Sequence, residues 1–272
     1  MVSTVTVMGM IFTLIVCFVV PLFFMAYLKV RKRSQILLFF IGVSLQITFV
    51  LVLERLCVGV LSSLPAVGQD PAVYAGVSAA AVGIFETAEF AVAFRVLRPY
   101  LHRISQPLMF SAGHACANAV FSAGLSSLTY YTFSLVVSEK GEEFLTQSLT
   151  GDELQYMQDM IAYVQGDSLP FYLNGADQLL MMVLYACIGV LMWMAMSGYL
   201  PAKWVIGVPV LLVLQRLPIE LASTGVLSSQ WLGTAMAGVV TVVAAVLVWK
   251  LAAQLPEEAK AAGNKISSRR LR

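Results

Sequence analysis

The chain contains seven apolar stretches of about 20 residues or more, and this feature limits its fold more than any other. A helix needs about 20 mostly apolar residues to cross the roughly 30 Å hydrocarbon core of a bilayer. Open strands would leave backbone groups unpaired in lipid. We therefore predict an all-α polytopic membrane protein with helices at residues 5–28, 35–61, 72–98, 106–137, 172–197, 203–224 and 230–252. They form one membrane domain, residues 1–255, followed by a basic tail, residues 256–272.

The composition excludes a water-soluble globule. Charged residues make up 12% of the chain and hydrophobic residues 59%, whereas an average soluble domain has roughly 25% charged residues. So few charges cannot cover the surface of a soluble particle of this size. We expect the lipid bilayer as the main partner and no nucleic-acid partner.

Basic residues alternate from one side of the predicted membrane to the other. With seven spans, one face receives residues 29–33, 98–103, Lys203 and 250–272, whereas the opposite loops contain Lys140 as their single lysine. The positive-inside rule then predicts an outside N-terminus and a cytoplasmic C-terminus. The first stretch is too long for a signal-peptide core and no basic residue precedes it, so we expect it to be retained.

The loop between the fourth and fifth spans, residues 138–171, is acidic and predicted to lie outside the membrane. Thr150 and Glu153 fit a capping box, and the apolar residues that follow recur at helical spacing. They predict a short surface helix that stops at Gly166. This helix is either a roof over the bundle or a plain solvated connector.

Ionisable side chains inside the spans are the candidate functional residues, because each costs about 2.5–3.5 kcal/mol on insertion scales. They are Glu54, Arg55, Glu86, Glu89, His114, Asp177, Arg216 and Glu220, with Asn118, Gln178 and Gln215 as uncharged companions. From the cytoplasmic end, the helical rise puts Glu86 and Gln215 about 18 Å along their spans and His114 about 12–14 Å along its span. These three residues are predicted to share a layer near the midplane.

The polar residues divide into three predicted groups. Small residues around His114 permit a close helix approach, and we expect Glu86 within hydrogen-bonding reach of it, since an unpaired buried carboxylate would have to take up a proton. Glu89 is expected in a structural ion pair with Arg216 or Arg95. Further groups are a polar cluster of Asn118, Gln215 and Arg216, and an outer, mainly structural group of Glu54, Arg55 and Asp177.

Two segments carry a family resemblance. Residues 83–95, with Glu86, Phe94 and Arg95, and residues 110–119, with His114, resemble the two-helix core of the YhfC family of intramembrane metalloproteases. That family is distantly similar to the CAAX-type and PrsW proteases. The resemblance implies a bacterial protein of the cytoplasmic (plasma) membrane, with zinc as its one cofactor.

The sequence departs from the family pattern at several positions. Thr87 stands where the family has a second glutamate, Asn118 where it has a glutamate, and Gln215 where a late histidine is expected. A catalytic zinc needs three protein ligands and an open position for water, and a glutamate serves as general base. The ligand set that this chain can offer is His114, Glu86 and Glu220, with Glu86 and Glu89 as the candidate catalytic carboxylates.

Three functions are compatible with this pattern. We favour a protease-fold protein with weakened or lost proteolysis, which acts as a binding protein, scaffold or accessory subunit for a membrane protein or peptide. The second is an active zinc-dependent intramembrane protease with an altered ligand set. The third is a small-solute transporter or receptor that uses the polar layer as its solute site.

The topology is tested by cysteine accessibility. Single cysteines placed in residues 139–167 should be labelled by a membrane-impermeant reagent from outside intact cells, because the basic clusters assign this loop to the outer face. A cysteine in residues 29–33 is the matched control and should stay unlabelled. Labelling of the 139–167 loop from the cytoplasmic side would contradict the seven-span arrangement.

Overall fold

The computed structural model describes residues 2–260, and this part of the chain is built from helices and their connections. Seven helical runs within it are long and apolar enough to cross a membrane: Thr4–Lys32, Ile36–Ser62, Pro71–Tyr100, Ser105–Lys140, Leu169–Met196, Trp204–Ser223 and Gln230–Ala253. All seven predicted spans are confirmed, with ends that differ by a few residues. Most of the predicted basic tail, residues 261–272, lies outside the described residues.

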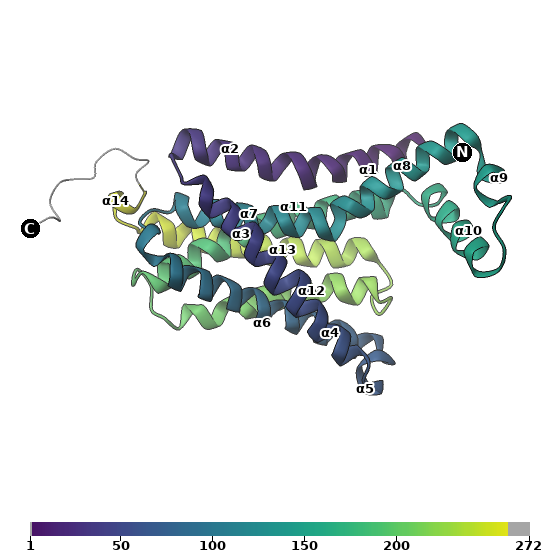
Figure 1. Ribbon diagram of the computed structural model, residues 1–272. Helices are drawn as coiled ribbons and strands as arrows, with labels where there is room; N and C mark the ends of the chain where they lie inside the picture. The colour runs from purple at the N-terminus through teal and green to yellow at the C-terminus, as the bar shows by residue number, and fades with distance from the viewer. Residues whose placement is uncertain (1, 261–272) are drawn as a thin grey trace, which may run out of the picture. The chain divides into compact units, whose positions relative to one another are not determined.

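The helices follow one another through short connections (Figure 1). They are α1 (Thr4–Leu14), α2 (Val20–Lys32), α3 (Ile36–Gln46), α4 (Arg55–Ser62), α5 (Pro65–Gly68), α6 (Pro71–Leu97), α7 (Ser105–Ala119), α8 (Leu125–Lys140), α9 (Glu142–Thr146), α10 (Gly151–Gln165), α11 (Leu169–Met196), α12 (Trp204–Ser223), α13 (Gln230–Ala253) and α14 (Glu257–Lys260). Three π-helical segments, Ile15–Val19, Ile47–Glu54 and Val120–Gly124, join α1 to α2, α3 to α4 and α7 to α8. A short 3₁₀ turn, Arg98–Tyr100, follows α6. Such π segments are often found close to functional sites.

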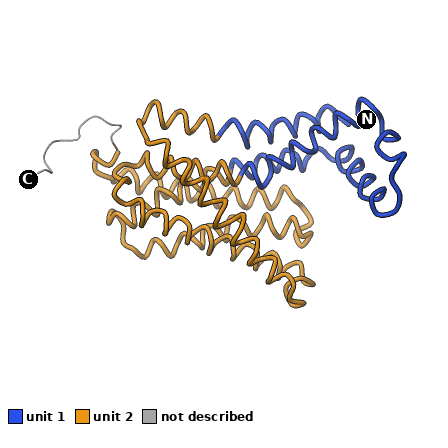
Figure 2. The backbone as a smooth tube through the Cα atoms, in the orientation of Figure 1, with its two compact units in different colours: residues 1–20, 119–179 blue, residues 21–118, 180–272 orange. Residues whose placement is uncertain are grey.

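The chain forms two compact units (Figure 2). Unit 1 consists of the residues up to Val20 together with Ala119–Leu179, and unit 2 consists of Pro21–Asn118 together with the residues from Leu180 onward. Asp177 and Gln178 belong to unit 1, and all other candidate residues belong to unit 2. The predicted single domain with a boundary at residue 255 stays a prediction.

Unit 1 contains the predicted surface helix. This helix, α10, ends at Gly166 as expected and buries Ile161 and Val164 inside the unit, so it is more than a solvated connector. The predicted capping box is wrong, because the Thr150 side chain makes no capping hydrogen bond. The chain enters α10 instead through Gly151, whose φ of +60° is a conformation that favours glycine.

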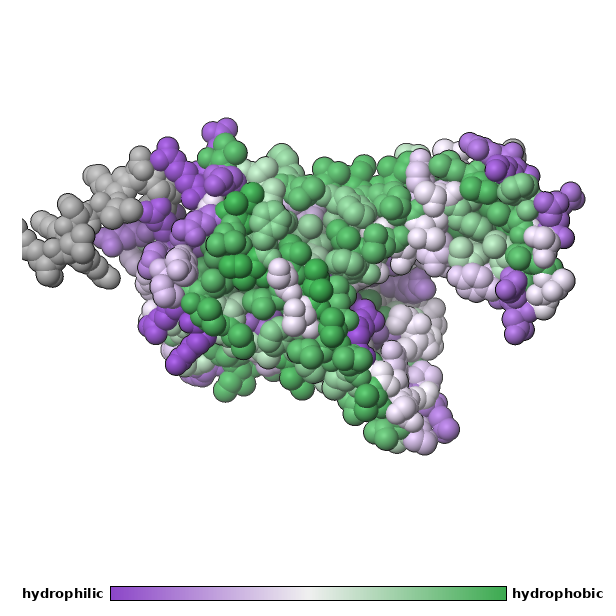
Figure 3. Space-filling view, in the orientation of Figure 1, coloured by the Kyte–Doolittle hydropathy of each residue, from purple (hydrophilic) through white to green (hydrophobic). Residues whose placement is uncertain are grey.

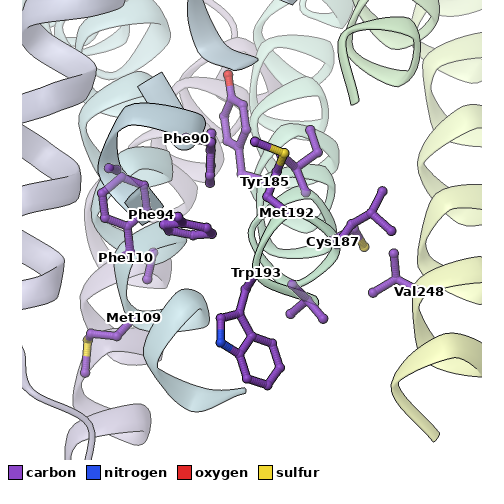
Figure 4. Packing of buried hydrophobic residues seen from close by; sticks show 14 of the residues in the cluster. Phe90, Phe94, Met109, Phe110, Tyr185, Cys187, Met192, Trp193 and Val248 are labelled. Atoms are coloured by element: carbon purple, nitrogen blue, oxygen red, sulfur yellow. The ribbon is translucent and has the colours of Figure 1, made fainter. Parts of the chain in front are cut away.

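Unit 2 has a core of aromatic side chains between α6, α7 and α11. Phe90, Phe94, Phe110, Tyr185 and Trp193 are each at most 1% exposed, and Figure 4 shows the three phenylalanine rings beside Tyr185 and above Trp193. The Phe90–Phe110 and Phe94–Phe110 centroids are 5.4 and 5.2 Å apart with edge-on geometry, the arrangement that aromatic quadrupoles favour. This core fixes the positions of the three helices that carry the polar residues.

The outer surface of unit 2 is apolar where soluble proteins are polar. Large side chains such as Phe23, Ile206 and Trp249 are more than 70% exposed, and hydrophobic residues dominate the lateral surface of unit 2 in Figure 3. Apolar surface of this extent is stable only in contact with lipid. The protein is an integral membrane protein.

Glycines let α7 approach two neighbouring helices closely. A Cβ atom on Gly113 would lie 1.9 Å from the Phe39 carbonyl oxygen of α3, and one on Gly42 would lie 2.2 Å from the Phe110 oxygen of α7. On α11, a Cβ atom on Gly189 would lie 1.9 Å from Ser111 Oγ. Small residues serve this purpose at helix interfaces in membranes. The backbone of α7 next to His114 is therefore held by contacts with α3 and α11.

We predict that Gly113→Ala destabilises the protein by about 1–3 kcal/mol or more, since the methyl group forces α3 and α7 apart. The measurement is thermal unfolding in detergent. Gly76→Ala is the matched control, because a Cβ atom on Gly76 meets nothing within 4 Å, and it should leave the stability unchanged or slightly raised. Equal behaviour of the two variants would contradict the close helix contact.

Candidate functional site

A chain of polar contacts joins α6, α7 and α11 inside unit 2. His114 Nδ1 lies 2.8 Å from Glu89 Oε1, and the Tyr185 hydroxyl donates a 2.6 Å hydrogen bond to Glu86 Oε1. The His114 and Tyr185 rings meet edge to face with centroids 4.3 Å apart. All four side chains are at most 1% exposed. The site is thus a buried centre made of two carboxylates, one imidazole and one phenol.

Helix α6 supplies both carboxylates of the centre. Glu86 and Glu89 share one face of the helix, and this face turns inward toward α7 and α11. One turn earlier, Gly83 allows α12 to approach, since a Cβ atom there would lie 2.7 Å from Val213 Cγ2. The Thr87 hydroxyl donates to the Gly83 carbonyl of its own helix.

Aromatic rings close the apolar side of the centre. The Phe90 ring lies 4.9 Å from the His114 ring, and Figure 4 shows Phe90 beside Tyr185 at the end of the phenylalanine cluster. Hydrogen bonds are stronger in such a low-dielectric environment, and an unpaired polar group is correspondingly expensive. The surroundings therefore favour a fixed pairing of His114 with Glu89 and of Tyr185 with Glu86.

Several polar atoms at these positions have no hydrogen-bond partner in the part of the chain that the structure describes. They are Glu86 Oε2, Glu89 Oε2, His114 Nε2 and both side-chain polar atoms of Gln215. Gln215 is 0% exposed. Buried polar groups in native proteins are normally satisfied by protein or water. Glu86, Glu89 and His114 therefore contribute three unsatisfied atoms to the buried centre, and the predicted place of Gln215 in the same layer stays a prediction.

The structure changes two of the predicted pairings. The predicted Glu86–His114 hydrogen bond is replaced by bonds of His114 to Glu89 and of Glu86 to Tyr185. The predicted ion pair of Glu89 with Arg216 or Arg95 is wrong, because Glu89 pairs with His114 and Arg95 is exposed. Arg216 Nε lies 2.9 Å from Glu220 Oε1 instead. That contact joins residues four apart on α12, which are neighbours on the helix surface. Glu89 is therefore available to hold the imidazole.

Two further predicted groups are partly resolved. Asn118 Oδ1 accepts a 3.3 Å hydrogen bond from Gln46 Nε2 of α3, and its contact with Gln215 or Arg216 stays a prediction. Glu54 is 4% exposed whereas Arg55, its neighbour, is exposed. These two side chains face different environments, and their predicted association with Asp177 stays a prediction.

Sequence reasoning missed Tyr185 and Gln46. Each is a polar side chain within an apolar helical run, and a buried tyrosine hydroxyl or glutamine amide needs a hydrogen-bond partner. This requirement is the signal that could have identified them. The uncharged residues considered were Asn118, Gln178 and Gln215, so Tyr185 and Gln46 were left out.

The donor set supplies part of a zinc shell. Glu89 holds His114 through Nδ1, the arrangement that orients a metal-binding imidazole, and Nε2 of the same ring and Glu86 Oε2 have no other partner among the described residues. A zinc site requires a third protein ligand, but residues 2–260 contain no group of three His, Cys, Asp or Glu side chains close enough to bind one metal ion. Glu220, the predicted third ligand, is paired with Arg216. The residues present do not fit a complete zinc site.

We predict that Tyr185→Phe destabilises the protein by about 1–3 kcal/mol, because Glu86 loses its donor while the ring packing is kept. The control is Tyr199→Phe, since Tyr199 is 43% exposed, and its effect should stay within about 0.5 kcal/mol. Thermal unfolding in detergent gives both values. In a double-mutant cycle with Glu86→Gln, the two substitutions should be non-additive by about 0.5–3 kcal/mol, and additivity would count against the bond.

The comparisons with known proteins identify the family of the chain. The sequence profile of a family described as YhfC intramembrane metalloprotease matches residues 16–236. This range contains the entire polar centre and most of the chain. No curated protein and no solved structure matches the sequence. The chain belongs to the YhfC intramembrane metalloprotease family.

Proposed function

We propose that this member of the YhfC family has weakened or lost proteolysis and binds a membrane protein or peptide as a scaffold or accessory subunit. In this proposal the N-terminus lies outside and the C-terminus in the cytoplasm of a bacterial cell. The observation that carries the proposal is the engagement of the carboxylates. Glu89 is hydrogen-bonded to His114 and Glu86 to Tyr185, and Glu220 forms an ion pair with Arg216.

Hydrolysis needs more than these residues supply. A metalloprotease requires a ligand set and, in addition, a carboxylate that removes a proton from the attacking water. Assigning Glu86 as a ligand and Glu89 as the partner of His114 leaves neither as a free base. General base catalysis contributes typically 10² to 10⁴ in rate, so its loss makes hydrolysis slow or absent.

Gln215, which we place in the same layer as the polar centre, adds the chemistry of a binding site. The buried Gln215 amide offers one acceptor and two donor hydrogens, and its side chain has no partner among the described residues. A peptide backbone presents the complementary pair, a carbonyl acceptor and an N–H donor. Such a backbone, inserted from the membrane, would satisfy groups that are otherwise costly to bury. This match supports a membrane peptide as the ligand.

An active protease is the second candidate, and one observation favours it. The Glu89–His114 bond resembles the carboxylate–histidine pairs that prepare an imidazole for zinc. In that case a residue outside the family pattern would complete the ligand set.

Zinc content and cleavage decide between the two candidates. We expect purified protein to bind much less than one zinc per chain and to leave a library of membrane-embedded peptides uncleaved, while still retaining peptides by photo-crosslinking. His114→Ala and Glu86→Gln should lower peptide retention or folding yield. Zinc-dependent turnover in the wild type that disappears in His114→Ala would overturn the proposal in favour of the active protease.

We also predict that restoring the family residues increases zinc affinity. Thr87→Glu combined with Gln215→His adds a carboxylate and an imidazole, which are both zinc ligands. Bound zinc after dialysis, measured by elemental analysis, should rise toward one per chain. The matched control is Thr87→Gln combined with Gln215→Asn, which adds polar groups of similar size without strong ligands. An equal zinc content in both double variants would argue against these two positions as the missing ligands.

A further inference from the structure

A groove on the surface of unit 2 has the features of a lipid site. It has a volume of about 520 Å³ and lies between α11, α12 and α13. Its walls include Leu191, Val210, Leu211 and Leu247, and Lys203 lines it at the start of α12. This volume falls within the range of about 300–1,000 Å³ that is typical of small-molecule sites. The polar centre described above contributes none of its residues to this groove.

Along α12, the residues that line the groove change from charged at its start to apolar further on. Lys203, Gly207 and Leu211 are spaced four residues apart and therefore share one face of the helix. From Lys203 to Leu211 the helix rises about 12 Å. A Cβ atom on Gly207 would meet nothing within 4 Å, so the glycine leaves open space in the middle of the groove. A molecule with a charged end and an apolar body fits this order.

A second lysine flanks the same end. Helices α12 and α13 are packed neighbours and run in opposite directions, so the start of α12 and the end of α13 lie at one end of unit 2 (Figure 1). On α13, Lys250 follows Leu247 of the groove by three residues and lies on the same helix face. Lys203 and Lys250 are both exposed, and neither ammonium group has an ion-pair partner within residues 2–260. The end of the groove therefore carries two unneutralised positive charges.

Trp204 marks the depth of this end in the membrane. Tryptophan is enriched at the level of the lipid headgroups, where its ring is in apolar surroundings and its N–H meets polar groups. Trp204 lines the groove immediately after Lys203. Ile206 and Val210, which also line the groove, are 73% and 54% exposed. The apolar part of the groove thus opens sideways into the hydrocarbon core, with the lysines at headgroup level.

We propose that this groove binds an anionic glycerophospholipid. One acyl chain occupies the space over Gly207 between Leu191, Leu211 and Leu247, and the phosphate lies between the ammonium groups of Lys203 and Lys250. Lysine is a common phosphate ligand, and basic pockets between membrane helices bind anionic headgroups. The site is separate from the polar centre and independent of whether the protein cleaves peptides.

Native mass spectrometry of the delipidated full-length protein tests the proposal. The probes are dioleoyl phosphatidylglycerol and dioleoyl phosphatidylcholine, which have the same acyl chains and differ in headgroup charge. We expect tighter binding of phosphatidylglycerol. Lys203→Gln with Lys250→Gln should weaken it by about fivefold for each lysine and leave phosphatidylcholine unaffected. Lys29→Gln with Lys32→Gln, an equal change of charge elsewhere on the predicted cytoplasmic face, should have no effect.

A substitution that fills the groove distinguishes a site for an acyl chain from a site that binds phosphate alone. Gly207→Leu should abolish the specific binding of phosphatidylglycerol although both lysines are kept, and Gly59→Leu, at another open position, should not. Excess inorganic phosphate should fail to displace the lipid. The proposal is overturned by equal binding of the two lipids, by equal effects of the two lysine pairs, by displacement with phosphate alone, or by unchanged lipid binding in Gly207→Leu.

Discussion

The close contact of α7 with α3 and α11 is the constraint on which the buried centre depends. Gly42, Gly113 and Gly189 bring backbones and small side chains together at distances that a Cβ atom would not allow. His114 directly follows Gly113, so the imidazole is placed by this contact. Hydrocarbon offers no water to an unpaired group, and the polar side chains of α6 and α11 must therefore find partners at the place that α7 dictates. The Glu89 and Tyr185 hydrogen bonds are the result.

Much of the fold could be predicted from the sequence because the bilayer sets the length of a crossing helix. All seven spans follow from runs of apolar residues, and the surface helix α10 follows from its period and from Gly166. The division into two units is not visible in such a pattern, because it depends on contacts between distant parts of the chain. The apolar pattern does not mark the π segments either. The capping box failed for a local reason, since the glycine after Thr150 offered another way into the helix.

The candidate site was predictable in its members and less so in its pairings. Charge inside an apolar span identified Glu86, Glu89 and His114, and their spacing identified the shared face of α6. The rotation of each helix about its axis decides which partner is nearest, and this rotation depends on neighbours that no local pattern reports. Arg216 therefore forms an ion pair with Glu220 on its own helix, where the helix geometry sets the separation of the two side chains. Tyr185 belongs to the site because its hydroxyl, buried in an aromatic core, needs a hydrogen-bond acceptor and donates to Glu86.

The two carboxylates of α6 give this helix a single allowed angular setting. Successive residues of an α-helix are separated by about 100°, so turning α6 by one residue would withdraw Glu86 from α11 and Glu89 from α7 together. The two bonds resist the same twist, and neither can break alone through a rigid rotation. The two hydrogen bonds thus fix the rotation of α6 about its axis relative to α7 and α11.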